Sequence, residues 1–229
     1  MRRVIRLVGT LMIVSGVATL GWALLVSQWQ DPFTAVYEWR EQSRLSERYD
    51  ARAREFALPA AKLAKASRAD LRRVATRYRR ALRRGEPLGV LTIGRLGLKK
   101  VVVNGTDHDS LTRGPGRDLR TAVPGQGELV YIAGHRTTYG APFSRIDQLE
   151  RGDYVKLDVP YATFTYRVSG HAIVAASATD RLRDRGREEL ALQACHPRFF
   201  ATHRYITYAK LVGFEPKTAP PGPAALAAG

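Results

Sequence analysis

Three residues of this sequence, Cys195, His135 and Arg204, have the types that acyl transfer needs. Cys195 is the only cysteine in the chain. A thiolate is the nucleophile, and an unperturbed cysteine pKa of about 8.5 leaves only a small fraction ionised near neutral pH. A nearby histidine can hold the imidazolium that stabilises the thiolate and then protonate a leaving amine, and a fixed guanidinium can bind an oxyanion. A lone cysteine is more often a small buried hydrophobe, so its surroundings must decide between the two interpretations.

Each of these residues lies at the edge of a hydrophobic run. His135 follows the run 129–133, in a loop that reads Ala-Gly-His-Arg-Thr-Thr-Tyr-Gly, Cys195 closes another run, and Arg204 lies just before the last one. His135 and Cys195 are 60 positions apart. That spacing alone does not show that the fold brings them together, so the elements around them matter.

The segment that carries these residues, 87–214, reads as a mostly β catalytic domain. Short alternating runs are separated by Gly, Pro, Asn and Asp, which is typical of strands. About eight short strands in this length predict a closed, or nearly closed, eight-stranded β-barrel with short helices. We expect one short helix at 141–149. The expected strands are 90–93, 100–103, 129–133, 154–159, 163–168, 171–175, 190–194 and 205–212.

The N-terminal segment reads as a membrane anchor. Residues 7–26 contain no charged side chain, and a helix of this length spans about 30 Å, the hydrocarbon thickness of a bilayer. Arg2, Arg3 and Arg6 precede it, which predicts a cytoplasmic tail (1–6) followed by an anchor (7–27). The chain would then cross the cell membrane once and carry its catalytic domain on the outer side. Trp22 and Trp29 suit the outer interface. A cleaved signal peptide is the alternative, but no A-x-A-like site follows the run.

Residues 28–86 read as a basic helical stalk of two helices, broken at Pro59. Residues 37–85 carry 15 basic and 6 acidic side chains, which accounts for much of the chain's net charge of +16. One interpretation is a solvated spacer, and another is an electrostatic contact with anionic lipid or an acidic wall. Ser67 is expected to cap the second helix with Asp70. Residues 31–33 read as a turn, and the Pro- and Ala-rich tail, 215–229, as disordered.

The motifs around the three reactive residues resemble those of the sortase family, cysteine transpeptidases of Gram-positive surfaces. The resemblance spans about 89–213 and rests on the Ala-Gly-His-Arg loop, the Leu-x-x-Cys strand end, and an Arg followed by Tyr-Ile-Thr-Tyr-Ala. Gly-Ala-Pro-Phe after the histidine loop and Cys-His-Pro-Arg-Phe at the cysteine look most like class E sortases of actinobacteria. The family implies Cys195 as nucleophile, His135 as acid/base, and Arg204 as the group that stabilises the oxyanion or positions the substrate.

The resemblance also implies a substrate and an acceptor. Cys195 would cleave a C-terminal sorting signal, LAXTG-like in class E, between Thr and Gly through a thioacyl enzyme. The expected partners are surface proteins with this signal, a peptidoglycan precursor or other amine acceptor, and the bacterial membrane. No cofactor and no nucleic acid are expected. Many sortases have threonine directly before the cysteine, where this chain has Ala194. Tyr139 and Ala194 are the expected substrate-binding residues.

Several alternatives stay open at this point. The domain could act mainly as a hydrolysing cysteine endopeptidase, or be an inactive wall-binding module on a membrane anchor. L,D-transpeptidases keep a His-Gly-Cys-type cluster, which is missing before Cys195. Arg198 is a rival to Arg204. A zinc site from His135, Cys195, His196 or His203 matches no common spacing, so no metal is expected. His108 and His171 read as structural.

Overall fold

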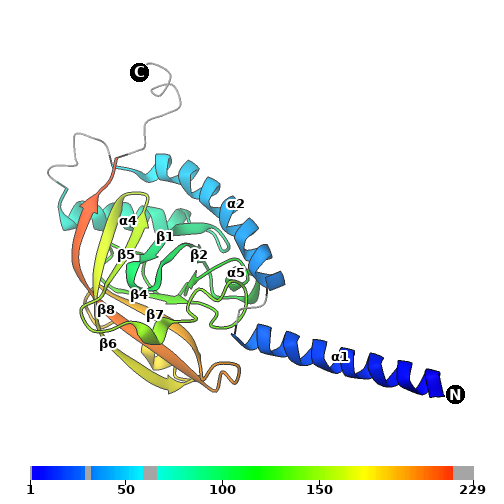
Figure 1. The fold of residues 1–229 in the computed structure, drawn as a ribbon. Coiled ribbons are helices and arrows are strands. Elements are labelled where there is room, and N and C mark those ends of the chain that lie inside the picture. Colours follow the sequence, from blue (N-terminus) through cyan, green and yellow to red (C-terminus); the bar gives the residue numbers. More distant parts are fainter. Residues whose placement is uncertain (1, 29–31, 59–65, 219–229) are drawn as a thin grey trace.

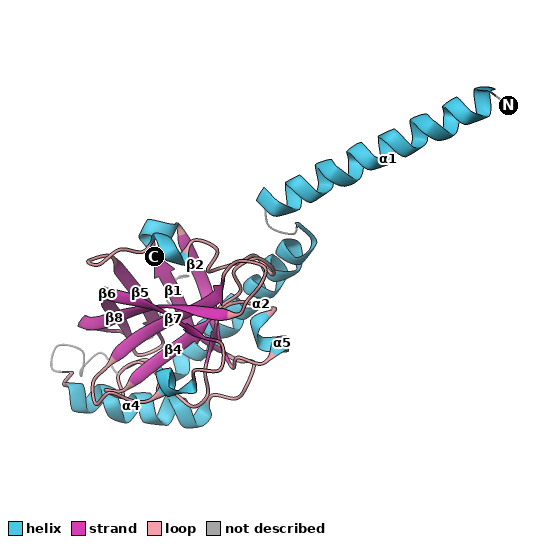
Figure 2. Cartoon of the chain, turned by 90° about the horizontal axis from the view of Figure 1, so that it is seen from below, coloured by secondary structure: helices cyan, strands magenta, loops and turns pink. Residues whose placement is uncertain are grey.

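The computed structural model describes residues 2–28, 32–58 and 66–218, and its centre is the closed barrel of eight strands that the sequence predicts. Around the barrel the strands follow the order β1-β2-β3-β4-β7-β8-β6-β5. Figures 1 and 2 show the barrel from two directions. The strands are β1 (Pro87–Ile93), β2 (Leu98–Asn104), β3 (Gly116–Arg117), β4 (Leu129–Ala133), β5 (Tyr154–Val159), β6 (Ala162–Ala175), β7 (Glu189–His196) and β8 (His203–Pro216).

The barrel interior is filled by one side of each alternating strand, as the pattern of β6 illustrates. Phe164, Tyr166 and Val168 are buried in the main core, whereas the intervening Arg167 is exposed. The two strands expected at 163–168 and 171–175 are, however, one continuous strand. A register shift between Val168 and Gly170 absorbs Ser169 and lets the same strand continue along β8. A bulge of this kind bends a strand without ending it.

The eighth strand of the barrel is β3, which the sequence did not predict. It pairs in parallel with β2 and antiparallel with β4, so two residues bridge the sheet. Arg117 in β3 is buried, and its Nε and Nη2 both donate to Oδ1 of Asn104, at 2.9 and 2.7 Å. A strand of two residues has no period to read, which is why it was missed.

The helix expected at 141–149 is wrong. The chain turns at Gly140 and Ala141, where φ is +66° and +36°, and only Ile146–Gln148 (η2) forms a short 3₁₀ helix. Positive φ values are incompatible with a right-handed helix. Phe143 and Ile146 are nevertheless fully buried, so the apolar pattern came from loop residues that pack on the barrel.

The two helices expected between the anchor and the barrel do form, as α2 (Pro32–Phe56) and α4 (Arg68–Ala81). Both are packed on the barrel, which differs from the picture of a solvated spacer (Figure 1). Ser67 caps α4 in a reciprocal capping box with Asp70, as predicted. The helical side chains buried on the barrel include Leu45, Tyr49 and Phe56 of α2 and Leu71, Ala75 and Tyr78 of α4.

Single polar side chains fix these helices in place. In α2, Gln42 donates from Nε2 to the carbonyls of Val101 (3.0 Å) and Arg113 (2.8 Å), and its Oε1 accepts from the Val101 amide (2.7 Å). In α4, the Tyr78 hydroxyl donates to the carbonyl of Leu88 at 2.7 Å. The helices therefore belong to the packed body of the protein.

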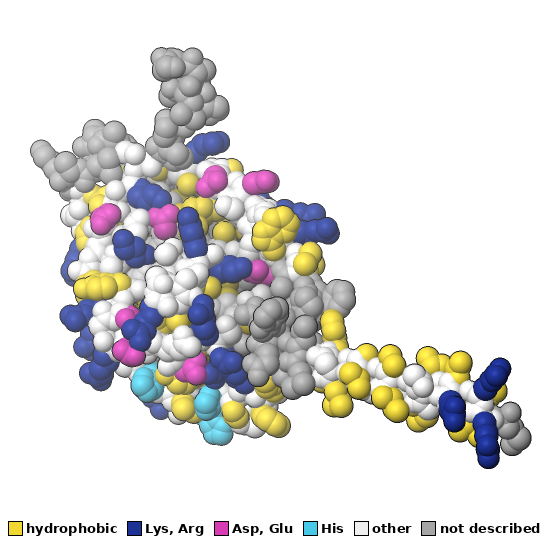
Figure 3. Space-filling model, viewed as in Figure 1, with side chains coloured by type: hydrophobic (Ala, Val, Ile, Leu, Met, Phe, Trp, Pro, Cys, Tyr) yellow, Lys and Arg dark blue, Asp and Glu magenta, His cyan; other side chains and the backbone are white. Residues whose placement is uncertain are grey.

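Helix α1 (Arg2–Gln28) is long and apolar enough to cross a membrane. Its apolar side chains up to Trp22 are exposed, and the basic residues gather at its beginning (Figure 3). The hydroxyls of Thr10 and Thr19 donate to the carbonyls of Arg6 and Ser15, four residues earlier. These bonds satisfy the polar groups within the helix itself.

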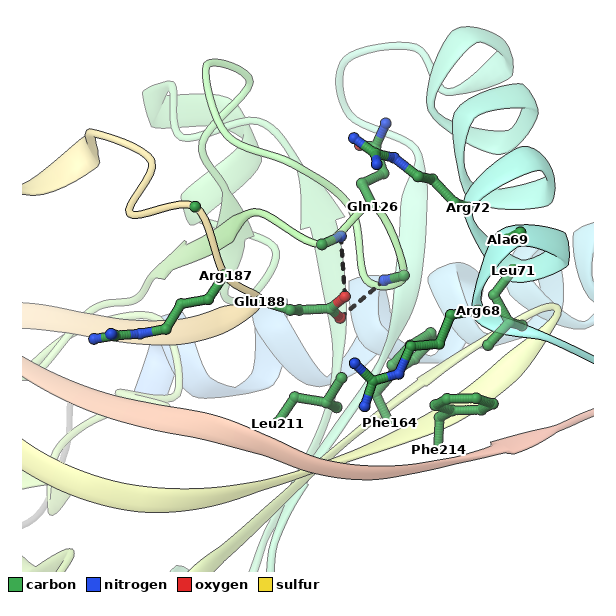
Figure 4. Close-up of a pocket in the computed structure, with 13 residues that line it drawn as sticks. Arg68, Ala69, Leu71, Arg72, Gln126, Phe164, Arg187, Glu188, Leu211 and Phe214 are labelled. Atoms are coloured by element: carbon green, nitrogen blue, oxygen red, sulfur yellow. Dashed lines mark hydrogen bonds between the residues drawn. The ribbon is translucent and has the colours of Figure 1, made fainter.

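The end of the barrel next to α4 holds a half-buried carboxylate and a cavity. Glu188, directly before β7, accepts from the amides of Gly125 (2.9 Å) and Gly127 (3.1 Å) (Figure 4). The cavity beside it measures about 510 Å³ and is lined by both apolar and arginine side chains. Burial raises the pKa of the Glu188 carboxyl. Because β7 begins here and ends at His196, Cys195 lies at the other end of the strand.

Some predictions fall on residues outside the described ranges. These are Trp29, Asp31, the break at Pro59 and most of the tail. The other two residues of the expected turn at 31–33, Pro32 and Phe33, begin α2, so the turn is wrong there. The first residues of that tail, 215 and 216, still pair within β8, and Thr218 forms an isolated bridge with Leu58. The domain boundaries otherwise stay predictions.

Candidate active site

Strand pairing brings the loop of His135 next to Cys195. Strands β4 and β7 are parallel neighbours, with Ala133 opposite Gln193. The ladder continues one step further, because the Gly134 amide donates to the Gln193 carbonyl at 2.9 Å. His135 and Cys195 each lie two residues beyond this last pair. Parallel strands run in the same direction, so both residues leave the barrel at the same end.

The antiparallel pair β7 and β8 places Arg204 directly opposite Cys195. Side chains of directly opposed residues share a face of the sheet, with Cβ atoms about 4.5–5.5 Å apart. Alternation along β7 identifies that face. Leu192 belongs to the barrel core, whereas Ala191 packs in a separate cluster on the outer surface. Cys195 has the parity of Ala191, so Cys195 and Arg204 face outward.

The outer surface around this pair is covered by apolar and hydrogen-bonded side chains. Leu129, Tyr131, Ile206 and Tyr208 form this cluster with Ala191, and Leu182 of the connection between β6 and β7 packs against it. The Tyr131 hydroxyl donates to Oε1 of Gln193 at 2.9 Å. Cys195 itself is half-buried. An extended peptide lying along this surface would reach a thiol that is accessible but flanked by apolar side chains.

The imidazole of His135 is half-buried, and its Nε2 has no hydrogen-bond partner among the described residues. Burial lowers the pKa of His135, and the charge of the nearby His108 is the second cause. A buried polar atom without a partner costs about 1–3 kcal/mol of folding free energy. Its presence therefore indicates a group that binds a ligand or transfers a proton. The position has therefore the properties of an acid/base.

Two glycines shape the loop that carries His135. A Cβ on Gly134 would lie 2.6 Å from Cδ2 of Phe143, so only glycine lets the loop pass over this buried ring. Gly140 has φ +66°, and a Cβ there would lie 2.8 Å from Oε2 of Glu38 in α2. Glu38 in turn pairs with Lys100 at 2.7 Å. Helix α2 thus supports the far end of the histidine loop.

Arg204 is fixed by the backbone of the turn before β8. Its Nη1 donates to the carbonyls of Ala201 (2.7 Å) and His203 (2.9 Å). Among the described residues, no hydrogen bond engages its Nε or Nη2. The rival Arg198 is exposed and donates to the Ser144 carbonyl. The structure therefore places Arg204, and not Arg198, opposite Cys195 in the register.

The two residues expected to bind substrate are placed differently from each other. The ring of Tyr139 lies 5.1 Å from that of His135 and 6.2 Å from that of His108, so Tyr139 belongs to the site. Ala194 is fully buried in the barrel core, on the face of β7 opposite Cys195. The structure does not bring the Ala194 side chain to the outer surface.

His196 and His203 lie opposite each other in β7 and β8, but no group of three or more His, Cys, Asp or Glu in the described ranges is close enough to hold a metal ion. His196 contacts Arg136, and His203 is exposed beside Thr202. His171 stacks on Tyr205, with ring centres 5.4 Å apart. His108, which read as structural, is exposed and lies near the site through Tyr139.

Comparison with known proteins identifies the family. A family model described as a sortase domain matches residues 91–212, more than half of the chain. The chain belongs to the sortase family. It is 33% identical over 132 residues to sortase D of Bacillus subtilis, in a match covering 56% of this chain and 65% of that protein. The match therefore spans just under two thirds of the curated relative's length.

Solved sortase structures share the fold. Sortase E from Streptomyces avermitilis is 32% identical, with a TM-score of 0.53, covering 58% of this chain and 93% of that one. This likeness agrees with the class that the motifs indicate. A sortase D5 transpeptidase from Clostridium perfringens is 23% identical, with a TM-score of 0.59, covering 77% of this chain and 98% of that one. This coverage extends beyond the barrel, so part of the helical segment aligns as well.

Proposed function

We propose that this sortase is a membrane-anchored cysteine transpeptidase. It cleaves a C-terminal sorting signal and joins the surface protein that carried the signal to a cell-wall amine. The observation that carries the proposal is the register of three strands. Cys195 lies opposite Arg204 across β7 and β8, and His135 leaves the parallel neighbour β4 at the matching step. Nucleophile, acid/base and oxyanion donor thus meet at one end of the barrel.

In the first half of the proposed reaction, the Cys195 thiolate attacks the carbonyl carbon of the signal's threonine. The free donors of Arg204 bind the oxyanion that forms. The imidazolium of His135 then gives its proton to the glycine nitrogen, and the C–N bond breaks. The products are a thioacyl enzyme and a free amine, and His135 is left neutral.

In the second half, an acceptor amine attacks the thioacyl carbon. Neutral His135 takes the proton from the attacking nitrogen, a new amide forms, and Cys195 leaves as thiolate. If water attacks instead, the same residues hydrolyse the signal. The lowered pKa of His135 helps the second half, because the neutral base is abundant at neutral pH, and limits the first half, which needs the imidazolium.

The proposed location follows from α1 and from how α2 is packed. Arg2, Arg3 and Arg6 at the start of α1 favour a cytoplasmic N-terminus and a catalytic domain outside. Only residues 29–31 separate α1 from α2, and an extended chain of this length reaches at most about 14 Å. Because α2 is packed on the barrel, we infer that the catalytic domain works close to the membrane surface.

The proposal can be tested with the purified full chain in detergent. The substrates are a peptide library varied at each position of an LAXTG signal, and reactions run with and without an amine acceptor. We expect cleavage between Thr and Gly and, with the amine, a ligated product detected by mass spectrometry. Cleavage without ligation would support a hydrolase instead. No cleavage of any peptide by folded protein would contradict the proposal and favour a wall-binding module.

A further inference from the structure

Arg136, the residue after His135, is a buried charged group at this end of the barrel. Its side chain is only 4% exposed. It reaches away from the outer surface, toward the barrel end, where its guanidinium carbon lies 5.9 Å from the ring centre of Tyr205. Burying an arginine is costly unless its donors are paired, so its partners indicate what it does.

The partners of Arg136 come from three different elements. Its Nη1 donates to the Cys195 carbonyl at 3.2 Å and lies 3.0 Å from Nδ1 of His196. Its Nη2 pairs with Oδ2 of Asp147 in η2 at 2.9 Å. A guanidinium can only donate, so Nδ1 of His196 is the acceptor in this contact. The end of β7, η2 and β8 are thus tied to the histidine loop.

The contact with Cys195 continues the ladder between β4 and β7 after backbone pairing ends. Successive carbonyls of a strand alternate between its two edges, so those of Gln193 and Cys195 point to the same neighbour. The Gln193 carbonyl accepts from the Gly134 amide. The Cys195 carbonyl accepts from the guanidinium of Arg136. This side chain therefore takes the place of the backbone amide that would bind the Cys195 carbonyl if the ladder continued.

We propose that Arg136 is a positioning residue that sets the placement of His135 relative to Cys195. It binds the carbonyl of the nucleophile's own peptide and is bonded through the backbone to the acid/base. A shift of the guanidinium moves both residues. The inference rests on the roles proposed for Cys195 and His135, and it assigns to Arg136 no contact with substrate.

Lysine cannot replace Arg136 in this position. An ammonium is a point donor without the planar fork that reaches Cys195, His196 and Asp147 together. We expect Arg136→Lys and Arg136→Met to lower kcat by on the order of 10²-fold, the cost of displacing a reacting group by about 1 Å, with KM changed less than about threefold. Arg145→Met is the matched control, because Arg145 is exposed and donates to the Leu96 carbonyl at 2.6 Å.

A second measurement separates positioning from simple stability. The rate at which iodoacetamide alkylates Cys195 is followed against pH, in the full chain in detergent. In the native protein we expect an inflection from the titration of His135, because its charge acts on the thiolate. In Arg136→Met the inflection should vanish and leave a single thiol titration. This readout needs no substrate, so it holds even if the proposed peptide reaction is not observed.

The outcomes divide as follows. Loss of kcat together with loss of the inflection supports the proposal. Native kcat per folded molecule, or an inflection that persists in Arg136→Met, overturns it and leaves a role in stability alone. If Arg136→Met does not fold, Asp147→Asn removes one partner and keeps the guanidinium. We then expect a kcat reduced about tenfold with unchanged KM, and an unchanged kcat overturns the proposal.

Discussion

Replacement of Arg204 by lysine separates a fixed oxyanion donor from a general positive charge. Two backbone carbonyls hold Nη1 of Arg204, at 2.7 and 2.9 Å, and this bonding leaves Nε and Nη2 to face a substrate at Cys195. A lysine ammonium at this position would either bind the same carbonyls or reach the substrate, but it cannot present a rigid fork to both. The charge would stay and the geometry would be lost.

The expected loss can be set from the number of donors removed. Losing one oxyanion donor costs on the order of 10²–10³ in rate, about 2.7–4 kcal/mol, and we expect kcat/KM of Arg204→Lys to fall within this range. The assay is cleavage of a quenched fluorescent sorting-signal peptide by the full chain in detergent. Arg198→Lys is the control, because Arg198 is exposed and, within the described part of the chain, its guanidinium donates only to the Ser144 carbonyl.

Three results would refute this reasoning. If Arg204→Lys keeps kcat/KM within about threefold of the native value, the donor geometry at Arg204 contributes little to the transition state. If Arg198→Lys shows the large loss instead, the strand register has been read correctly but the wrong arginine has been assigned. A rise in KM with kcat unchanged would also contradict a role at the oxyanion, because only uniform substrate binding would have been lost.

Three further expectations concern pH and stability. The charge of His108 is the second cause, after burial, of the lowered pKa of His135, and His108→Gln removes it. The pKa of His135 should therefore rise, and the alkaline limb of the pH–kcat/KM profile should move to higher pH, by a smaller amount in 1 M salt. An alkaline limb that does not move would contradict this expectation. Tyr78 is fully buried and hydrogen-bonded, so Tyr78→Ala should lower the free energy of unfolding in urea by about 3–5 kcal/mol and Tyr78→Phe by about 1 kcal/mol. A loss below about 1 kcal/mol for Tyr78→Ala would indicate that α4 is a solvated spacer. Burial raises the pKa of Glu188, so its stabilising contribution is present below the ordinary value of 4.5 and is lost as pH rises through the folded-state pKa. The free energy of unfolding of the native protein relative to Glu188→Gln should therefore fall as pH is raised above 4.5. A difference that stays constant with pH would contradict this expectation.

Strand alternation was enough to predict the barrel, because it appears within single strands such as β6. The pairing of strands was harder to foresee. The bulge at Ser169 joins two expected strands into one, and β3 is held by neighbours rather than by any pattern of its own. Near the site, the run at 141–149 was expected to be a helix. Its apolar residues Phe143 and Ile146 are buried, as core-facing residues of a helix would be, but positive φ at Gly140 and Ala141 is incompatible with a helix that begins there.

The packing of α2 was readable in the sequence but was concealed by charge. Glu38, Gln42, Leu45, Tyr49 and Phe56 follow one another at helical spacings of three, four and seven, and this stripe faces the barrel. The many arginines around it gave the segment the composition of a solvated helix. A search for this stripe of buried residues, rather than the average composition of the segment, would have predicted that α2 packs on the barrel.

The reactive residues could be named from their motifs, but their supports could not. Cys195, His135 and Arg204 are at strand ends where loops carry function. Arg136 was visible only as part of the histidine motif, since its partners Asp147 and His196 lie 11 and 60 positions away. Ala194 is the opposite case. The threonine that many sortases have before the cysteine suggested a substrate-binding role for this position, whereas strand alternation turns the Ala194 side chain into the core.

The central claim is that Cys195 forms a covalent thioacyl intermediate, and intact-protein mass spectrometry tests it most directly. The full chain is mixed with a sorting-signal peptide without any amine acceptor and quenched in acid. We expect the native protein to gain the mass of the acyl fragment ending in threonine, on a peptide containing Cys195, and to lose it when an amine is added. Cys195→Ala should gain nothing. An adduct in Cys195→Ala, or peptide turnover by that variant at the native rate, would contradict the claim.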